Sequence, residues 1–309
     1  MQIAVIVICL LLFVVIAALI LGSLYFYRLA VSRRSKSFLE GNADLADIPD
    51  PKYLWLEHQK LEKISLRSFD GLALQAHWLE AAKPSAKTVI IAHGYSGHGL
   101  QMDSLAKLYH EEYGFHVLLP DNRGHGESEG SYIGFGWHDR KDYLQWIDYV
   151  VERRGQKEEI VLHGVSMGGA TVLMTSGEPM PEQVKAVVSD CAYSSAKEEL
   201  RYQMNRMFRL PSFPFLQLTS LVCRLRAGYW FKEASAVSQV AKAKKPILFI
   251  HGDQDTFVPS TMVQPLYEEC ASDKALFIVP GAGHGLAYST DPTGYKEAVQ
   301  SFLKRWIAQ

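Results

Sequence analysis

The sequence His163-Gly164-Val165-Ser166-Met167-Gly168-Gly169 follows a short apolar run, residues 160–162, and precedes a run of small residues that suits a helix. In a Gly-x-Ser-x-Gly turn the serine takes a strained conformation between strand and helix, and glycines two positions either side leave room for the bend. The spacing therefore predicts a nucleophile elbow centred on Ser166. A surface serine on an ordinary strand-turn-helix connection is the alternative that this stretch alone leaves open.

Length and composition narrow the classes of protein to consider. The chain has 309 residues, enough for one large α/β domain or two modest ones. Its 32 Lys and Arg residues nearly balance its 33 Asp and Glu residues, which disfavours nucleic acid as a partner. The four cysteines lack the spacing of a metal site or a disulfide framework, so they fit a reducing compartment. They are Cys9, Cys191, Cys223 and Cys270.

Residues 3–21 form an uninterrupted run of nineteen apolar residues. As a helix this run spans roughly 28 Å, close to the hydrocarbon thickness of a bilayer. It has no basic residue before it, exceeds the usual apolar region of a signal peptide, and is followed by no clean cleavage site. We therefore expect a single-pass transmembrane anchor over residues 1–27 in the cell membrane, with a cleaved signal peptide as the alternative.

Positive charge gathers directly after the apolar run. Arg28, Arg33, Arg34 and Lys36 all precede the first acidic residue, Glu40. By the positive-inside tendency, this asymmetry predicts a cytoplasmic catalytic domain, and the cysteine usage agrees with that placement. Residues 28–60 are expected to form a basic juxtamembrane segment and linker, since they are polar and include Asp-Ile-Pro-Asp-Pro.

The folded domain is expected over residues 61–309. Two alternating runs within 61–79, joined by Asp-Gly, predict an antiparallel hairpin. Six apolar runs of β character follow, separated by helix-length amphipathic segments. This alternation predicts the α/β class, with a mostly parallel central sheet, helices on both faces, and functional residues in loops after the strand ends. The six runs are residues 88–92, 116–119, 160–162, 186–188, 247–250 and 276–279.

A glycine-rich loop, His93-Gly94-Tyr95-Ser96-Gly97-His98-Gly99, follows the first of these runs. Acyl transfer needs two preorganised N–H donors for the oxyanion, one from such a loop and one from the residue after the nucleophile. The backbone N–H groups of Tyr95 and Met167 are the candidates. An ordinary strand-to-helix loop stays open as an alternative, whereas a metal bound by His93 and His98 lacks a third ligand at suitable spacing.

The loops after the last two apolar runs carry candidate partners for Ser166. A serine hydroxyl needs a base, and the base needs a carboxylate that holds its tautomer. His284 is the candidate base, preferred to His125 because the glycines that flank His125 leave its ring poorly held. Asp255 and Asp253 both lie in the other loop, and the residues alone leave open which of them is the carboxylate.

Four segments together resemble the α/β-hydrolase superfamily over residues 60–309. Within it, the chain is similar to serine hydrolases of the esterase-like and prolyl-oligopeptidase-like groups, including membrane-anchored bacterial members. The segments read HGYSGHG, DNRGHGESEG, GVSMGG, and HGDQDTFVP followed by GAGHG.

The resemblance implies a role for each candidate residue. Ser166 would be the nucleophile, Asp255 the carboxylate and His284 the base. The amides of Tyr95 and Met167 would form the oxyanion hole. The resemblance also implies neither a metal nor an organic cofactor.

About 55 residues separate the run that ends near Asp190 from the strand that begins at Pro246, more than a single-helix crossover needs. We expect a small helical cap at about residues 192–240. Its apolar residues alternate with arginines, which predicts either a pocket for an acyl or aromatic group or helices that only pack on the domain. The apolar residues are Tyr202, Met204, Met207, Phe208, Leu210, Phe213, Phe215 and Leu216, and the arginines are Arg201, Arg206, Arg209, Arg224 and Arg226.

These features predict a membrane-anchored serine hydrolase that cleaves a carboxylic ester, or a thioester, through an acyl-enzyme on Ser166. The expected substrate is a small-molecule or lipid-like acyl ester, and carboxylesterase or lipase activity is preferred to peptidase activity. A serine peptidase or amidase of prolyl-oligopeptidase-like type stays open, since it uses the same triad. Outside the enzymes, a membrane-tethered interaction module with the same fold is the alternative. The sequence does not determine acyl-chain length or oligomeric state.

Overall fold

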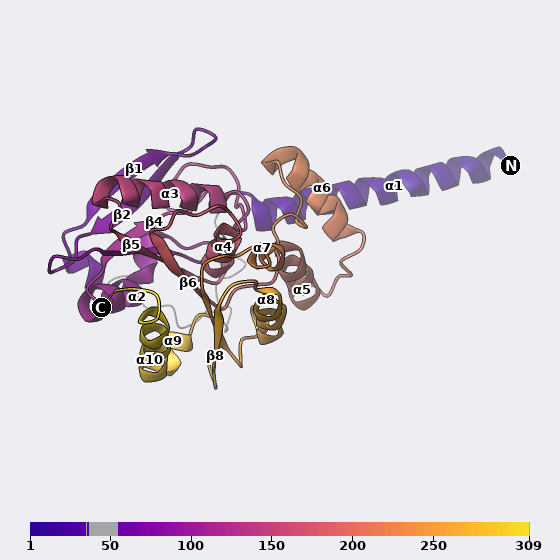
Figure 1. The fold of residues 1–309 in the computed structure, drawn as a ribbon. Coiled ribbons are helices and arrows are strands. Elements are labelled where there is room, and N and C mark those ends of the chain that lie inside the picture. The colour runs from indigo at the N-terminus through magenta and orange to yellow at the C-terminus, as the bar shows by residue number, and fades with distance from the viewer. Residues whose placement is uncertain (35, 37–54, 309) are drawn as a thin grey trace.

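A computed structural model describes residues 1–34, 36 and 55–308 of the chain (Figure 1). Its strands are β1 (Glu62–Arg67), β2 (Ala73–Leu79), β3 (Lys87–Ala92), β4 (His116–Pro120), β5 (Glu159–Val165), β6 (Val184–Asp190), β7 (Ile247–Gly252) and β8 (Lys274–Val279). Its α-helices are α1 (Gln2–Phe26), α2 (Asp103–Lys107), α3 (Asp139–Arg154), α4 (Met167–Ser176), α5 (Ala196–Phe208), α6 (Phe215–Ala227), α7 (Ala236–Val240), α8 (Val263–Glu269), α9 (Ala287–Thr290) and α10 (Pro292–Leu303). The described residues also form the short helical turns η1 (Tyr27–Val31), η5 (Trp55–His58), η6 (Gly99–Met102), η7 (Leu108–Glu112) and η8 (Ser260–Met262).

The eight strands form one sheet in the order β1-β2-β4-β3-β5-β6-β7-β8. β1 pairs antiparallel with β2 in the predicted hairpin, and β2 pairs antiparallel with β4. All the remaining neighbours are parallel. The predicted α/β-hydrolase architecture is therefore confirmed, with an antiparallel N-terminal pair on a mostly parallel sheet.

Alternating residues of the strands point to opposite faces of the sheet, and the core divides accordingly. In β3, Ile90 packs in the cluster formed with α3, α4, α7 and α8, whereas Val89 and Ile91 pack in the cluster formed with α2 and α10. Both faces are covered, which explains why these strands read as continuous apolar runs. The carboxyl ends of the parallel strands lie along one edge, where the loops carrying the candidate site residues meet.

The N-terminal helix α1 extends away from the body of the domain (Figure 1). Together with η1 it is long and apolar enough to cross a membrane, and its most apolar part makes no buried contact with the domain. Only its end packs on the domain. Phe26 packs edge-on against Phe208 and Phe215, with ring centroids 5.2 and 5.9 Å apart.

Polar contacts also hold the end of this helix on the domain. Tyr95 Oη donates a hydrogen bond of 2.7 Å to the carbonyl of Ala30. The Arg33 guanidinium donates to the carbonyls of Ser128 and Gly126 at 2.6 and 2.7 Å. Ala30 and Arg33, which follow the apolar run, are thus held on the body of the domain by these hydrogen bonds.

The helices α5 and α6 lie between β6 and β7, where a cap was predicted, and α6 lies beside the end of α1 (Figure 1). Much of the predicted linker over residues 28–60 lies outside the described residues. Its beginning is structured, because residues 27–31 continue the helix as η1. The domain boundaries at residues 27, 60 and 192–240 stay predictions.

Candidate active site

Ser166 occupies the turn between β5 and α4. Its backbone has φ 57° and ψ −118°, a conformation that is strained for any residue with a Cβ. A Cβ on Gly164 would collide with the carbonyl oxygen of Gly168, and a Cβ on Gly168 would collide with the carbonyl oxygen of Ala92. Glycine is therefore required on both sides of the serine, as the spacing in the sequence indicates.

The hydroxyl of Ser166 lies beside the imidazole of His284. Ser166 Oγ is 2.8 Å from His284 Nε2, and His284 Nδ1 is 2.7 Å from Asp255 Oδ2. The three side chains come from loops after β5, β8 and β7, and all three are buried. With its proton on Nδ1, His284 donates to Asp255 and accepts from the serine hydroxyl, which is the arrangement that a general base needs.

Several groups hold the carboxylate of Asp255. Its Oδ1 accepts hydrogen bonds from the backbone N–H groups of Phe257 and Val258, at 2.9 and 2.8 Å. His251 Nε2 lies 3.3 Å from Oδ2. Burial alone would raise the pKa of Asp255, but hydrogen bonds from His251 and His284 lower this pKa to about 2. Asp255 is therefore ionised at neutral pH and can stabilise a positive charge on His284.

Asp253, the rival carboxylate, has a different partner. Its Oδ1 accepts a hydrogen bond of 2.7 Å from the backbone N–H of Gly281. Asp253 thus ties the loop after β7 to the loop that carries His284. Its side chain is exposed, whereas that of Asp255 is buried.

Tyr95 and Met167, which carry the two candidate oxyanion donors, line the same pocket. Met167 is the first residue of α4, where a backbone N–H has no partner within the helix. The loop after β3 passes close to the serine, since a Cβ built on Gly94 would lie 3.6 Å from Ser166 Cβ. Tyr95, the next residue, lines one pocket together with Ser166 and Met167.

Comparisons with known proteins agree with this fold and site. Residues 87–222 match the family model of the alpha/beta hydrolase fold, and residues 220–307 match that of the dienelactone hydrolase family. Protein YqkD of Bacillus subtilis is 30% identical over 223 residues, which cover 72% of this chain and 73% of YqkD. The chain belongs to the α/β-hydrolase superfamily.

Two further similarities concern the structure and the membrane. The esterase Pf2001 of Pyrococcus furiosus superposes with a TM-score of 0.66 at 25% identity, over 81% of this chain and 94% of that chain. The membrane protein YNL320W of Saccharomyces cerevisiae is 26% identical over 86% of each chain. This α/β-hydrolase therefore has relatives named as an esterase and as a membrane protein.

The pocket beside Ser166 in this α/β-hydrolase is mainly apolar. Met204, Met207, Phe208 and Leu216 of the cap line it, which are half of the cap residues expected to form an apolar face. Other walls come from the loops after β3, β4, β6 and β7, from the segment after α6, and from the end of α1 and η1. The lining residues from the end of α1 and from η1 are Phe26, Leu29 and Ala30.

One buried carboxyl group, Glu199 of α5, also lines this pocket. Its Oε1 accepts a hydrogen bond of 2.8 Å from Gln203 Nε2, and its Oε2 has no partner among the described residues. Burial raises the pKa of Glu199 to about 8, with a contribution from the negative charge of Asp255. Glu199 is therefore mostly protonated at neutral pH, which keeps the pocket uncharged.

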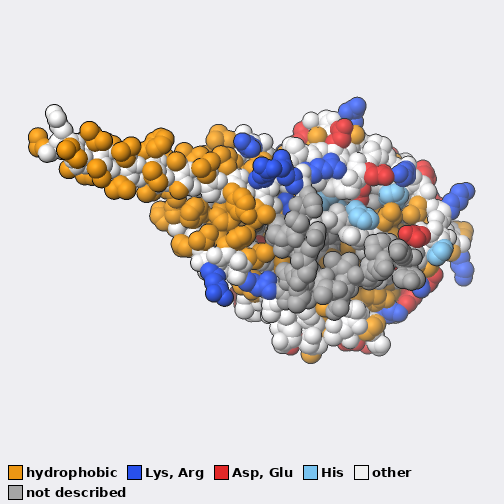
Figure 2. All heavy atoms as spheres, turned by 180° about the vertical axis from the view of Figure 1, so that it is seen from behind, with side chains coloured by type: hydrophobic (Ala, Val, Ile, Leu, Met, Phe, Trp, Pro, Cys, Tyr) orange, Lys and Arg blue, Asp and Glu red, His pale blue; other side chains and the backbone are white. Residues whose placement is uncertain are grey.

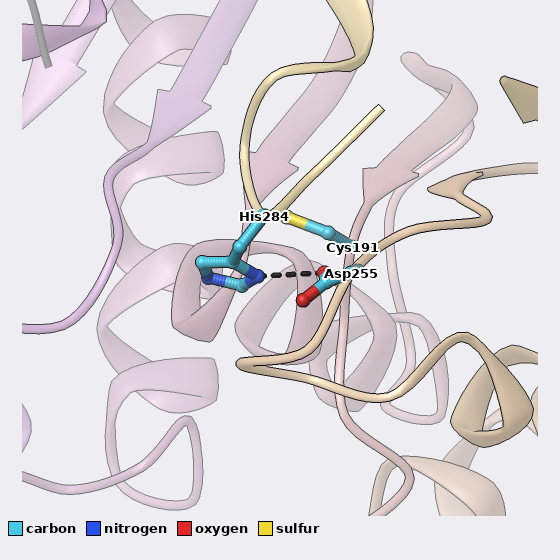
Figure 3. A group of neighbouring side chains, drawn as sticks. All are labelled: Cys191, Asp255 and His284. Atoms are coloured by element: carbon cyan, nitrogen blue, oxygen red, sulfur yellow. Dashed lines mark hydrogen bonds and ion pairs between the residues drawn. The ribbon is translucent and has the colours of Figure 1, made fainter. Parts of the chain in front are cut away.

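Cys191, Asp255 and His284 form a group whose possible ligand atoms lie within 4.8 Å of one another (Figure 3). A metal ion would need lone pairs that the α/β-hydrolase site already uses. His284 Nδ1 is bonded to Asp255, and both oxygens of Asp255 have donors. Burial also raises the pKa of the Cys191 thiol well above its usual value, which disfavours the thiolate that binds metals. The donor set does not fit a metal site.

His125, the rival base, is buried and has other partners than Ser166. Its Nδ1 lies 3.0 Å from the carbonyl oxygen of Arg123, and its ring packs edge-on against His93. Burial lowers the pKa of His125 to about 3. Arg123 is itself fixed by Asp142 and Asp70, at 2.7 and 2.9 Å. This part of the α/β-hydrolase is a packed structural network.

Three features of the site were not predicted from the sequence. His251 stands beside Asp255, and its position directly after a predicted strand was the only available signal. Glu199 lies on an amphipathic helix, where nothing in the pattern separates a pocket carboxyl from a solvated one. The third feature is the wall that α1 and η1 contribute, since no local pattern indicates that the N-terminal helix contacts a pocket.

Proposed function

We propose that the protein is a serine hydrolase that cleaves a carboxylic ester, or a thioester, through an acyl-enzyme on Ser166. The observation that carries this proposal is the chain of two short contacts from Ser166 Oγ through His284 to Asp255, at 2.8 and 2.7 Å, beside an apolar pocket. A weak nucleophile, an oriented base and an ionised carboxylate are the parts that acyl transfer requires.

In the proposed reaction, His284 Nε2 takes the hydroxyl proton as Ser166 Oγ attacks the substrate carbonyl. The Tyr95 and Met167 amides stabilise the oxyanion, and His284 then gives its proton to the leaving alcohol or thiol. Water attacks the acyl-enzyme as His284 takes one of its protons, and His284 then returns this proton to Ser166 Oγ as the acyl–oxygen bond breaks and a carboxylic acid is released. Asp255 stays ionised throughout and stabilises the imidazolium.

The pocket supports an acyl ester over a peptide. A peptide carries backbone N–H and C=O groups that need hydrogen-bond partners when they are buried, whereas a hydrocarbon chain needs none. The lining is largely made of Phe, Leu, Met and Tyr side chains. Esterase activity is therefore the proposal, and the same triad acting as a peptidase or amidase is what a substrate panel would detect instead.

We also propose that α1 is an uncleaved membrane anchor, with the catalytic domain in the cytoplasm. A signal peptide is removed after translocation, so it would not be expected to contribute to an active-site pocket. Here Phe26, Leu29 and Ala30 border the same pocket as Ser166. The similarity to a protein named as a membrane protein supports the anchor, and the basic residues after the helix support the orientation.

The test is hydrolysis of a short-chain p-nitrophenyl ester, a thioester and an aminoacyl-arylamide by the purified full-length protein. Ser166→Ala is expected to lower ester turnover by at least about 10⁴-fold and to abolish labelling by a fluorophosphonate. Ser65→Ala, an exposed serine on β1, is the matched control and should keep full activity. Full turnover by Ser166→Ala, or labelling at another residue, would refute the proposal.

A further inference from the structure

The cap exposes large apolar side chains on one of its faces. Phe213 is 72% exposed, Leu225 77% and Leu221 41%. We call these three residues the cap face. Outside α1, the other described large apolar side chains that are exposed are Phe69, Leu276 and Ile278, and they lie on the hairpin turn and on β8. Clustered exposed apolar residues mark an interaction surface, because leaving them in water is unfavourable.

The cap face lies next to the part of α1 that directly follows the apolar run. A Cβ on Gly22 would lie 2.9 Å from the ring of Phe215, and Arg226 stacks over the ring of Tyr27. Helix α6 therefore packs on residues 22–27, directly after the run at 3–21. If that run spans a bilayer, this packing holds α6 at the membrane surface.

The charge around the cap face suits an anionic membrane. Residues 200–232 contain five arginines and Lys232 and no acidic residue, whereas the whole chain has a net charge of −1. Figure 2 shows hydrophobic side chains gathered where the anchor meets the domain, with Lys and Arg side chains beside them. Apolar residues that enter a bilayer, flanked by arginines at the level of the head groups, are typical of interfacial membrane binding.

The pocket beside Ser166 lies next to the place where α1 and the cap meet. Phe26, Leu29 and Ala30 of the anchor end form part of its wall, and Phe208 and Leu216 of the cap form another part. Anchor and cap therefore shape the pocket together, next to the surface that would contact the bilayer. An acyl chain could pass between membrane and pocket along apolar surface, without crossing water.

We propose that the cap face inserts into an anionic bilayer beside α1, and that the Ser166 pocket takes the acyl chain of a membrane lipid directly from it. The partner is the lipid surface, chosen over a second copy of the chain because the cap face adjoins a helix suited to span a membrane. Uptake of the acyl chain by the pocket, the substrate half of the proposal, rests on the proposed function. Insertion of the cap face into the bilayer, the insertion half, does not depend on catalysis.

Insertion is tested by fluorescence quenching of the full-length protein in vesicles of phosphatidylcholine with about one third phosphatidylglycerol. A bimane label on Leu225→Cys is expected to be quenched by brominated lipids and shielded from aqueous iodide. The same label on Gln300→Cys is the matched control, because Gln300 is exposed on α10, which covers the opposite face of the sheet. Iodide should quench this control and brominated lipids should not.

The substrate half is tested with the double variant Leu221→Glu/Leu225→Glu, whose residues do not line the pocket. Hydrolysis of 4-methylumbelliferyl oleate dissolved in the same vesicles should fall about ten-fold, because two apolar contacts with the bilayer are lost. Hydrolysis of a soluble short-chain ester should stay unchanged. Leu276→Glu, a matched exchange of an exposed leucine on β8, should change neither rate.

The outcomes separate the two proposals. Iodide quenching at residue 225 without quenching by brominated lipids, or crosslinking of residue 225 to a second copy, would overturn insertion. Equal losses on the soluble and the vesicle-bound ester would overturn direct uptake from the membrane. Quenching of the label at residue 225 by brominated lipids, together with a wild-type protein that hydrolyses neither ester, would support insertion and reject the proposed function together with the substrate half.

Discussion

At the scale of single residues, the two carboxylates after β7 differ in what they touch. Asp255 contacts His284 and Asp253 contacts the backbone of Gly281. We predict that Asp255→Asn lowers kcat by about 10⁴-fold, since the amide favours the wrong imidazole tautomer. Asp253→Asn should stay within a few fold of wild type. Steady-state kinetics of both variants on one ester checks this, and a larger loss in Asp253→Asn would reverse the assignment.

The buried carboxyl of Glu199 predicts a pH dependence of stability. Its pKa is raised to about 8, from 4.5, mainly by burial, so the folded state keeps a proton that the unfolded state has released. The groups that act on it are Gln203, Asp255 and Arg206. A group that binds more protons when folded makes the free energy of unfolding fall as pH rises, here between about 4.5 and 8.

Glu199→Gln removes this titration and keeps the shape of the side chain. Below pH 4.5 the variant and the wild type should be similarly stable, and the variant should gain relative stability as pH rises toward 8. Thermal unfolding in detergent micelles across this pH range measures the difference. A difference in Tm that does not change with pH would contradict a protonated, buried Glu199.

At the scale of elements, the turn between β5 and α4 stores backbone strain at Ser166. Such strain costs about 1–3 kcal/mol in residues with a Cβ. Both Ser166→Ala and Ser166→Gly remove the hydroxyl, but only the glycine relieves the strain. Glycine also lowers the free energy of unfolding by about 0.5–1 kcal/mol, because it gives the unfolded chain more conformational entropy. We therefore expect Ser166→Gly to be about 1 kcal/mol more stable than Ser166→Ala.

The two inactive variants form a matched pair, so thermal unfolding compares them without any effect of catalysis. A 1 kcal/mol gain corresponds to about 2–4 °C in Tm for a domain of this size. A Tm of Ser166→Gly at or below that of Ser166→Ala would mean that the turn is not strained.

At the scale of the whole molecule, charge asymmetry about α1 predicts where the domain lies. Four basic residues follow the apolar run before the first acidic one, and the cap adds further arginines on the same side. We expect the domain to be protected from external protease in intact spheroplasts and to be cleaved after lysis. Cleavage from outside would place the domain on the other side of the membrane and contradict the positive-inside interpretation.

Much of the fold was predictable from the sequence. The runs at 88–92 and 247–250 lie within β3 and β7, because strands covered on both faces are mainly apolar along their whole length. The Gly-x-Ser-x-Gly spacing located the elbow, because the conformation of that turn excludes a Cβ at both glycines. The catalytic roles of Ser166, Asp255 and His284 stay predictions.

What the sequence by itself determined is local: the apolar periods of strands and helices, the elbow around Ser166, and a helix apolar enough to span a membrane. Only the tertiary structure decided which carboxylate faces His284, how Glu199 enters the pocket, and that the end of α1 forms part of its wall. The physical reason is that backbone strain and apolar periodicity act between near neighbours in the chain. Contacts such as Ala30 with Tyr95, or Ser166 with His284, join residues far apart in sequence and exist only once the sheet has brought the loops together.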